Sequence, residues 1–246
     1  MRKALSQKCG LFFVQIKSFR SRDTNAPILP PNPELTAVYP RPNPNFGQIQ
    51  QIEPGGRTLL NAFDLSFRGQ ASRWFTGQGQ YTLSRFDNNT SGINAFPQNQ
   101  YQPNAEWGRA DQDRLQRFNL IGNINPDHWL SLGVSATLYS GTPYNETTGN
   151  DYYHTGLGNA RPTGVGRNTL PGGGVTSLDL IYSHDFQLTK AAGDKAKLLS
   201  AGVSAFNVLN HANFTNYIGA LSSPLFGQPT AALAARQLQF SLGFRF

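Results

Sequence analysis

The histidines of this 246-residue chain are the first residues to examine for catalysis, because imidazole serves both as an acid–base group and as a metal ligand. They are His128, His154, His184 and His211, and none lies in a metalloprotease or nucleophile-elbow motif. Gly164-Val165-Gly166 resembles part of a dinucleotide loop, but it lacks the third glycine and follows no buried strand. The sequence therefore nominates no catalytic residue and no cofactor, and we expect the protein not to be an enzyme.

A second candidate for chemistry is the segment 150–159, which is rich in Asp, Asn and Gly as cation-binding loops are. It holds a single carboxylate, Asp151, whereas Ca²⁺ takes six to eight oxygen ligands that usually include several carboxylates. The lone Cys9 forms neither a disulfide nor a Cys-based metal site within one chain. We therefore expect no metal site.

The charge of the chain is positive but dispersed. The net charge is +7, yet the lysines lie only within 3–17 and 190–197 and the arginines are spread mostly one at a time. Nucleic-acid binding requires a basic patch or a recognisable module, so we expect no nucleic-acid partner. The charged fraction is only 14%, against roughly 25% in ordinary soluble domains. This deficit argues against a typical cytosolic enzyme.

The elements that carry these residues are predicted to be strands. Apolar and polar residues alternate with the period of two, which is typical of a strand with two different faces. The alternating stretches are 63–68, 75–84, 117–124, 130–139, 178–185, 197–209 and 238–246, with an earlier candidate at 11–17. No stretch approaches the roughly 18 apolar residues of a membrane-spanning helix.

The connections between these stretches alternate in length. Short links at 69–73, 125–128 and 188–195 take turns with long ones at 87–112, 141–174 and 210–235, and 18–56 is a fourth long loop with a short strand at 47–52. Compact soluble domains rarely contain several loops above about 15 residues. Outer-membrane barrels, by contrast, have short periplasmic turns and long extracellular loops. We therefore expect the long loops to lie at one end of the strands and the short turns at the other.

The two faces of the predicted strands differ in chemistry. The polar face carries Gln, Asn, Ser, Thr, Gly and isolated charges, which suits a water-filled lumen, and the apolar face has no charge along the middle of any strand, as contact with lipid requires. Aromatic residues near the predicted strand ends suit interfacial girdles: Phe63, Trp74, Phe86, Trp129, Tyr139, Tyr182 and Phe246. A soluble sandwich would instead bury the apolar faces against a second sheet.

Three groups of candidate site residues follow from this pattern. Aromatic side chains in the predicted extracellular loops are candidates for ligand binding, namely Tyr101, Trp107, Tyr144, Tyr152 and Tyr153, with Tyr217 beside them. Charged residues on the polar face should face the lumen, where we expect them to pair with each other or with a plug: Arg117, Asp179, Asp185 and Arg245. The last strand places Phe240, Leu242, Phe244 and Phe246 on one face, which looks like the C-terminal signal recognised by the barrel-assembly machinery.

Several short motifs resemble a known family. They are Asn25-Ala26-Pro27, Pro44-Asn45-Phe46-Gly47-Gln48-Ile49, the run from Asn159 to Asn168, the run from Ala205 to Phe214, and Pro224-Leu225-Phe226-Gly227. From about residue 25 to Phe246 the chain resembles the C-terminal part of a TonB-dependent receptor barrel of the Oar-like group. The resemblance implies a barrel of about 22 strands whose plug domain, energised through the TonB complex, gates the import of a scarce ligand.

The expected fold is therefore an all-β, antiparallel transmembrane β-barrel fragment of about eight meandering strands. We expect residues 1–56 to form an N-terminal strand and a Pro/Asn-rich loop, and 57–246 to form the C-terminal strands, without a plug. The expected location is the outer membrane of a Gram-negative-type cell. The expected partners are outer-membrane lipid, the barrel-assembly machinery, the TonB complex only through the plug, and a small ligand such as a sugar, peptide or chelate. The alternatives are a complete small pore or structural barrel and a soluble carbohydrate-binding sandwich.

Overall fold

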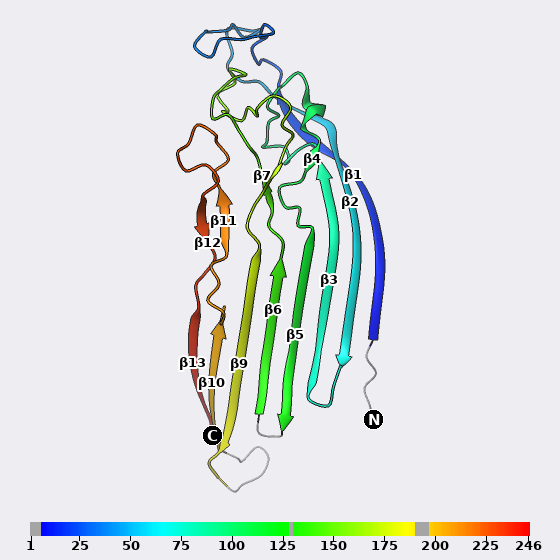
Figure 1. The fold of residues 1–246 in the computed structure, drawn as a ribbon, viewed down its shortest axis with the longest axis vertical. Coiled ribbons are helices and arrows are strands. Elements are labelled where there is room, and N and C mark those ends of the chain that lie inside the picture. Colours follow the sequence, from blue (N-terminus) through cyan, green and yellow to red (C-terminus); the bar gives the residue numbers. More distant parts are fainter. Residues whose placement is uncertain (1–5, 128–129, 190–196) are drawn as a thin grey trace.

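The computed structural model describes residues 6–127, 130–189 and 197–246, and the regular secondary structure of this part of the chain is almost entirely strand (Figure 1). It contains no helix long and apolar enough to cross a membrane. The elements are β1 (Ser6–Asp23), β2 (Gln50–Gln70), β3 (Phe75–Asn88), the 3₁₀ helix η1 (Pro103–Glu106), β4 (Gly108–Arg109), β5 (Gln116–Asp127), β6 (Leu130–Tyr139), β7 (Pro143–Tyr144), β8 (Leu170–Pro171), β9 (Val175–Gln187), β10 (Leu198–Phe206), β11 (Phe214–Tyr217), β12 (Pro229–Ala232) and β13 (Gln237–Arg245).

The long strands form one antiparallel meander in the order β1-β2-β3-β5-β6-β9-β10-β13, with the short β4 beside β3. The long loops gather at one end of the sheet, and the turn between β2 and β3 lies at the other end, as does the chain's C-terminus (Figure 1). The predicted strands and the predicted placement of the loops are confirmed. Residues 128–129 and 190–196, which include parts of two predicted short turns, lie outside the described residues.

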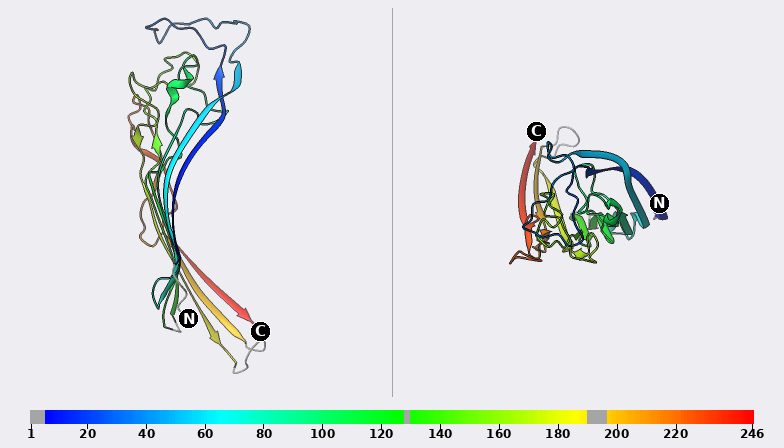
Figure 2. Two further views of the ribbon diagram at one scale, coloured as in Figure 1. Left: turned by 90° about the vertical axis from the view of Figure 1, so that its right-hand side faces the viewer. Right: turned by 90° about the horizontal axis from the view of Figure 1, so that it is seen from above.

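The sheet is open. Its edges are β1 and β13, which pair with β2 and β10 respectively and not with each other. Viewed from above, the strands follow an arc with these two edges at its ends (Figure 2). Within the described residues the other sheets are the two-stranded pairs β7–β8 and β11–β12, so no second large sheet covers either face. The alternative of a soluble sandwich therefore lacks its second layer.

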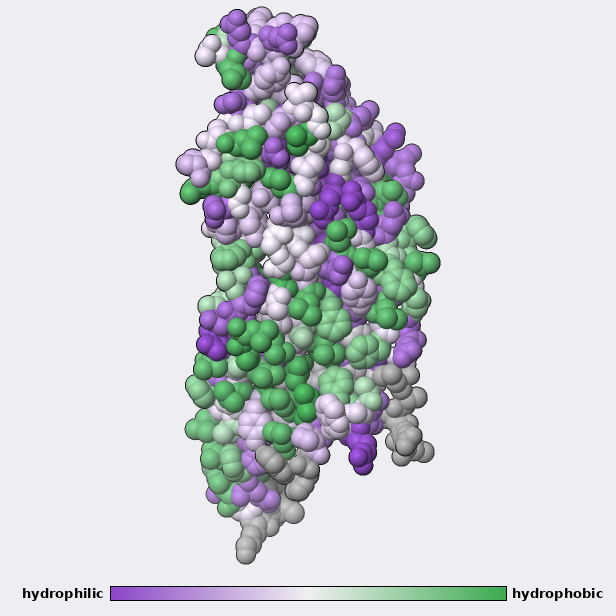
Figure 3. Space-filling model, in the orientation of Figure 1, coloured by the Kyte–Doolittle hydropathy of each residue, from purple (hydrophilic) through white to green (hydrophobic). Residues whose placement is uncertain are grey.

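The register of the strands sorts side chains onto two faces. Cross-strand neighbours such as Val134 and Leu180, or Val203 and Phe240, share what we call the apolar face. The opposite, polar face carries rows such as Ser66, Gln80, Asn119, Thr137 and Ser177, which follow one another from β2 to β9. Figure 3 shows apolar residues spread over the strands and polar residues gathered over the loops above them. This is the two-sided chemistry expected when lipid lies on one side and water on the other.

Two glycines on the apolar face are covered by neighbouring aromatic rings. A Cβ added at Gly79 would lie 2.3 Å from the ring of Phe67, and one added at Gly122 would lie 2.7 Å from the ring of Phe75. Because a larger side chain would displace these rings, the glycines allow Phe67 and Phe75 to lie flat along the sheet. The rings then supply the apolar surface that the glycines lack.

The first two strands run further toward the loops than predicted. The predicted strand 11–17 is part of β1, which continues to Asp23. The predicted loop 18–56 shrinks to 24–49, because β2 begins at Gln50 and includes half of the short strand predicted at 47–52. Position 56, the predicted limit of the N-terminal region, therefore lies inside β2.

The alternation of apolar and polar residues does not predict the longer β1 and β2, because the added residues carry charge and do not alternate. Arg20 and Arg22 both pair with Glu53 across the strands, at N–O distances of 2.8 and 3.2 Å. A β-bulge between Ser18 and Arg20 changes the register opposite Pro54, a residue that cannot donate a ladder hydrogen bond. Because this part of the ribbon projects beyond the apolar stretch, polar contacts rather than alternation hold it together.

The predicted aromatic girdle is wrong for two of its members. Phe86 lies opposite Leu60 and Tyr139 opposite Arg117, which places both on the polar face. The Tyr139 hydroxyl donates a hydrogen bond of 2.5 Å to the Asn119 amide oxygen there. A position near a strand end does not specify the face, because each step along a strand reverses it. Trp129, another predicted member, lies outside the described residues.

The assignment of the faces has a direct test in membranes. After Cys9 is replaced, Val134→Cys should react preferentially with a lipid-soluble maleimide and Ser135→Cys with a water-soluble one, because adjacent residues point to opposite faces. Labelling would be measured by the mass of the purified protein. Equal labelling of the two positions by both reagents, or the reverse preference, would show that the faces are assigned wrongly.

Candidate functional site

The long loops pack into one polar unit at the end of the sheet. Fully buried side chains in the described part of the chain are mostly polar and belong to this region; the largest are Gln100, Asn168, Asp23, Asp113 and Ser21. Buried polar groups must be hydrogen-bonded to be tolerated. The contacts among these residues therefore determine how the loops are held.

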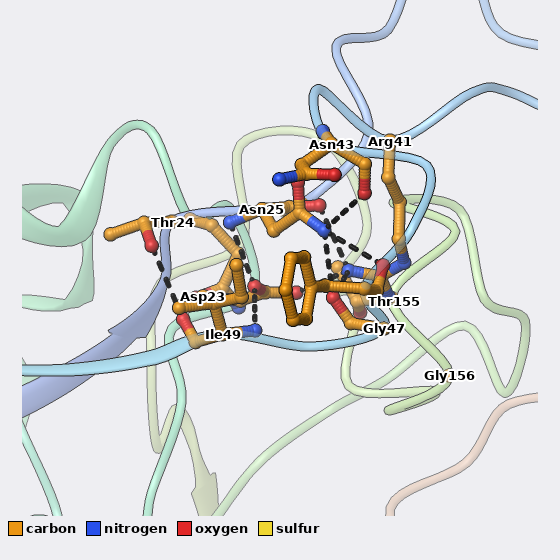
Figure 4. A network of polar contacts seen from close by, with 12 residues as sticks. Asp23, Thr24, Asn25, Arg41, Asn43, Gly47, Ile49, Thr155 and Gly156 are labelled. Carbon is orange, nitrogen blue, oxygen red and sulfur yellow. Dashed lines mark hydrogen bonds and ion pairs between the residues drawn. The ribbon is translucent and has the colours of Figure 1, made fainter.

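Asn25 organises the loop between β1 and β2 (Figure 4). Its amide nitrogen donates to the carbonyl oxygens of Asn43, Phe46 and Gly47 at 3.0, 2.9 and 2.8 Å. Its amide oxygen accepts from the backbone N–H of Asn43 at 2.7 Å. One buried side chain thus closes a long, proline-rich loop back onto its own beginning.

Asp23, which is 1% exposed, joins this loop to the next one (Figure 4). Its carboxylate accepts from the backbone N–H groups of Asn25 and Ile49, both at 2.9 Å, and from the Arg41 guanidinium at 2.7 Å. Its own backbone N–H donates to the Gln100 side-chain oxygen at 2.7 Å. The buried charge is therefore paired and hydrogen-bonded, as burial of a carboxylate requires.

A buried ion pair links the loop of 89–115 to the loop of 140–174. The two terminal nitrogens of Arg161 lie 2.8 and 3.0 Å from the two carboxylate oxygens of Glu106. The side chains of both residues are almost fully buried. The Gln98 side-chain oxygen also accepts from the Arg161 backbone N–H at 2.8 Å. Such a bidentate pair fixes orientation as well as distance.

A second arginine of the same loop holds the top of β3. The buried Arg167 guanidinium donates to Asn88, to the Ser91 hydroxyl at 2.9 Å and to the Asp111 carboxylate at 2.9 Å. Asp111 also accepts from the Asn168 amide at 2.7 Å. Burial opposes ionisation of Asp111, but hydrogen bonds from Ser91 and Asn168 and the charge of Arg167 lower its pKa below the ordinary value. The ionised carboxylate is thus part of the folded arrangement.

The loop of 207–236 is tied to the same unit. Thr147 donates its N–H to the carbonyl oxygen of Gly219 at 2.7 Å and accepts from the N–H of Leu221 at 2.8 Å. The Asn213 amide oxygen accepts from the backbone N–H of Thr176 at 2.7 Å, and its nitrogen donates to the Thr176 carbonyl at 2.9 Å. All four long loops are therefore connected through side-chain or backbone hydrogen bonds.

The locked loops frame a hollow of about 500 Å³ lined by three of the candidate tyrosines, Tyr101, Tyr152 and Tyr153. The proline-rich segment 27–33 forms part of its wall. The Tyr101 hydroxyl donates to the Ala26 carbonyl at 2.7 Å, and the rings of Tyr152 and Tyr153 meet edge to face at 5.3 Å. Burial, and secondarily Tyr152, raises the pKa of the Tyr153 hydroxyl. The Tyr153 hydroxyl is therefore neutral, and the Tyr101 ring is held by its hydrogen bond.

Polar side chains also line the hollow, namely those of Asn99 and Gln102. Thr155 is only 9% exposed, and its hydroxyl is buried without a hydrogen-bond partner within the described residues.

The remaining aromatic candidates lie elsewhere. Tyr144 stacks on Tyr217 with ring centroids 5.2 Å apart, and Trp107 follows η1 with 45% of its surface exposed. None of the three lines the hollow. The structure thus brings together only part of the predicted aromatic set.

The segment 150–159 uses its carboxylate to shape the loop. Asp151 accepts from the backbone N–H groups of Thr155 at 3.0 Å and Gly156 at 2.7 Å. The described residues contain no cluster of three or more His, Cys, Asp or Glu side chains that could hold a metal ion. Asp151 is therefore committed to the turn in which His154 adopts a positive φ of 51°.

The four charged residues expected to face the lumen all lie on the polar face: Arg117, Asp179, Asp185 and Arg245. Asp179 accepts from the Ser177 hydroxyl at 3.0 Å and from the Asn207 backbone N–H at 2.8 Å. Asp185 accepts from the Ser200 hydroxyl. Ion pairs among the described residues do not join any two of the four. The carboxylates bind neighbouring donors instead.

Three residues of the expected assembly signal lie on β13, an edge of the sheet, and the fourth, Phe246, directly follows it. Phe240, Leu242, Phe244 and Phe246 are all more than half exposed. Phe244 and Phe246 stack with ring centroids 5.7 Å apart. The structure thus presents these side chains in a row along a strand whose outer edge is free in the described structure.

The residues that lock the loops were not singled out from the sequence as site residues. Asn25, Arg161, Arg167 and Asn213 belong to the motifs on which the resemblance rests. Glu106 and Gln100 belong to none of them. The motifs were therefore a usable signal for loop-locking residues, although their partners could not be identified without the fold.

Removing one partner of the buried ion pair should loosen the loops. Arg161→Ala leaves the Glu106 carboxylate buried without its cation, which costs roughly 3–5 kcal/mol in comparable cases. We expect proteases added to intact membranes to cut within 89–115 and 140–174 much faster than in the unaltered protein. Arg85→Ala, which breaks the more exposed pair with Asp87, is the control and should leave cleavage nearly unchanged.

Protonation of the Asp111 carboxylate at low pH should loosen the same loops. The pKa of Asp111 is lowered in the folded protein. The ionised carboxylate therefore stabilises the folded loops fully above pH ~3.9, the ordinary pKa, and this stabilisation is lost as the pH falls through the lowered pKa. Pepsin cleavage of 140–174 should therefore accelerate as the pH drops below about 4, and Asp111→Asn should flatten that acceleration. An unchanged pH profile in Asp111→Asn would show that Asp111 does not cause the acid sensitivity of the loops.

Comparison with known proteins agrees with this architecture. A family model described as an outer membrane beta barrel domain matches residues 14–165. The match begins in β1 and ends in the loop that carries Arg161, so it covers more than half of the chain, including four strands of the meander. Searches of curated proteins and of solved structures gave no match. With its antiparallel meander, its two-sided strands and this match, the chain belongs to the outer membrane beta barrel domain family and is a protein of the outer membrane.

Proposed function

We propose that the chain contributes strands to the barrel wall of a TonB-dependent receptor of the Oar-like group, which binds a small ligand outside the cell and imports it. The outer-membrane barrel family provides the setting. The motif resemblance supplies the receptor class. A plug domain would couple the barrel to the TonB complex, and the chain itself would perform no catalysis.

The observation that carries this proposal is the locked aromatic hollow. Loops of a passive pore need only leave the lumen open, whereas a receptor gains affinity when its binding site is formed before the ligand arrives. Here Asp23, Asn25 and the Glu106–Arg161 pair hold the loops in place. The result is a preformed cavity at the end of the sheet where a barrel's extracellular loops lie.

The lining of the hollow favours a ligand with both flat and polar surfaces. Tyrosine rings contact apolar or sugar-ring faces, and the polar residues Asn99 and Gln102 also line the hollow. A sugar, a peptide or an organic chelate has this combination. Below the loops, the polar face with Asp179 and Asp185 would line the route and contact a plug.

The terminal strand indicates a second partner for the protein. An edge strand with free backbone groups is a template for strand addition by another protein. We propose that the barrel-assembly machinery recognises β13 in this way, with Phe240, Leu242, Phe244 and Phe246 as its side-chain signal.

The binding role can be tested on cells that produce the full-length receptor. Glycan and peptide arrays would first identify a ligand, and the double variant Tyr152→Ala/Tyr153→Ala should then weaken binding at least tenfold, because central aromatic contacts commonly contribute more than about 1.4 kcal/mol. Trp107→Ala, which alters an exposed aromatic residue outside the hollow, is the matched control. Equal loss in the two variants would argue against the hollow as the binding site.

The energy requirement separates a receptor from a passive pore. Uptake through a TonB-dependent receptor should stop when a protonophore collapses the proton gradient, while ligand binding at the surface continues. Accumulation of the same labelled ligand inside the cell and its binding to the surface would be measured in parallel. Uptake that persists without the gradient would favour the alternative of a simple outer-membrane pore.

A further inference from the structure

An apolar patch interrupts the polar face at the middle of β1 and β2 and near the loop end of β3. Phe12 and Val14 of β1 lie opposite Ala62 and Leu60 of β2, and Leu60 lies opposite Phe86 of β3. These residues share the face of Asp64 and Thr82, which are hydrogen-bonded to each other. Three adjacent strands therefore contribute apolar side chains to a single area of a face that is mostly polar.

The patch lines a hollow of about 450 Å³ and is exposed. The exposed fraction is 48% for Phe12 and 37% for Val14. A contiguous apolar area in contact with water is costly and commonly marks a place where something binds. The volume falls within the range of pockets that hold small organic ligands.

Two arginines beside the patch have no carboxylate partner among the residues that the structure describes. Arg114 and Arg117 line the same hollow, and neither forms an ion pair within the described residues. Arg114 donates to the Ser140 carbonyl at 2.8 Å and lies over the ring of Tyr139, and Arg117 donates to the Gln112 carbonyl at 3.3 Å.

The charge of these arginines is poorly compensated. Burial, and secondarily the neighbouring Arg117, lowers the pKa of the Arg114 guanidinium. Asp64 lines the same hollow, but its carboxylate accepts from Thr82 and forms no ion pair with either arginine. An anion placed between Arg114 and Arg117 would relieve their mutual repulsion.

We propose that this hollow binds an amphipathic carboxylate, with its hydrocarbon chain on Phe12, Leu60 and Phe86 and its acidic group at Arg114 and Arg117. A sugar would leave the apolar patch uncovered, and a neutral hydrocarbon would leave the two charges unpaired. This site lies on the polar face, separate from the aromatic hollow, so it goes beyond the proposed receptor function and does not depend on energised uptake.

Photo-crosslinking in outer-membrane vesicles that contain the full-length protein tests the proposal. The probe is dodecanoate with a diazirine at the end of its chain, and labelled peptides are identified by mass spectrometry. We expect labels around Phe12, Leu60 and Phe86. Arg117→Ala, which loses one weak hydrogen bond, should lower this labelling about fivefold, and Arg114→Ala/Arg117→Ala should lower it tenfold or more.

The controls make the result depend on charge and position. Arg68→Ala removes an arginine that lines another hollow on the polar face, and labelling should not change. Arg117→Glu should favour the corresponding dodecylammonium probe over dodecanoate. Labelling that is insensitive to the arginines, equal with the two probes in the unaltered protein, or absent because protein covers the patch would overturn the proposal.

Discussion

Inside hydrocarbon, every backbone N–H and C=O group must bond within the protein, because no water is available to replace a missing partner. This constraint explains why the described chain is a meander of long, continuously paired strands and not a layered globule. A strand that meets lipid on one face and water on the other has no need of a second sheet. Val134 and Phe240 therefore remain on an uncovered face, where lipid replaces the core of a soluble protein.

Where the strands leave the apolar zone, a different interaction takes over. The loop unit is surrounded by water, so apolar burial contributes little, and its interior consists of amides, carboxylates and guanidinium groups. Such networks are stable only when nearly every group has a partner. Asn25 and Asp23 illustrate this: each makes several hydrogen bonds to backbone groups that no strand can satisfy. The rigidity of the loops therefore depends on a few polar side chains.

The alternation of residues was sufficient to predict the strands, their order and the end at which the loops lie, because lipid on one face imposes a strict period of two. The alternation does not predict the part of β1 beyond Lys17. There, charged residues such as Arg20 and Glu53 pair between β1 and β2, and water contacts both faces of the two strands. The alternation also fails for Phe86, whose aromatic character suggested the lipid side although its register places it on the polar one. Pairs such as Glu106 and Arg161, separated by 55 positions, became visible only once the loops were folded together.

The first strands carry a group of adjacent apolar residues on the polar face, where Ile121 of β5 and Ile181 of β9 lie singly. In β1, Leu11 and Phe13 lie on the apolar face, whereas Phe12 and Val14 lie on the polar one, because consecutive residues alternate. A strand that only had to separate lipid from water would carry polar residues at the latter positions, as β6 does at Ser135. Contact with lipid therefore explains why Leu11 and Phe13 are apolar. It does not explain Phe12 and Val14, which an occupant of the interior would cover. The arginines beside them restrict the chemistry of that occupant to a group with negative charge.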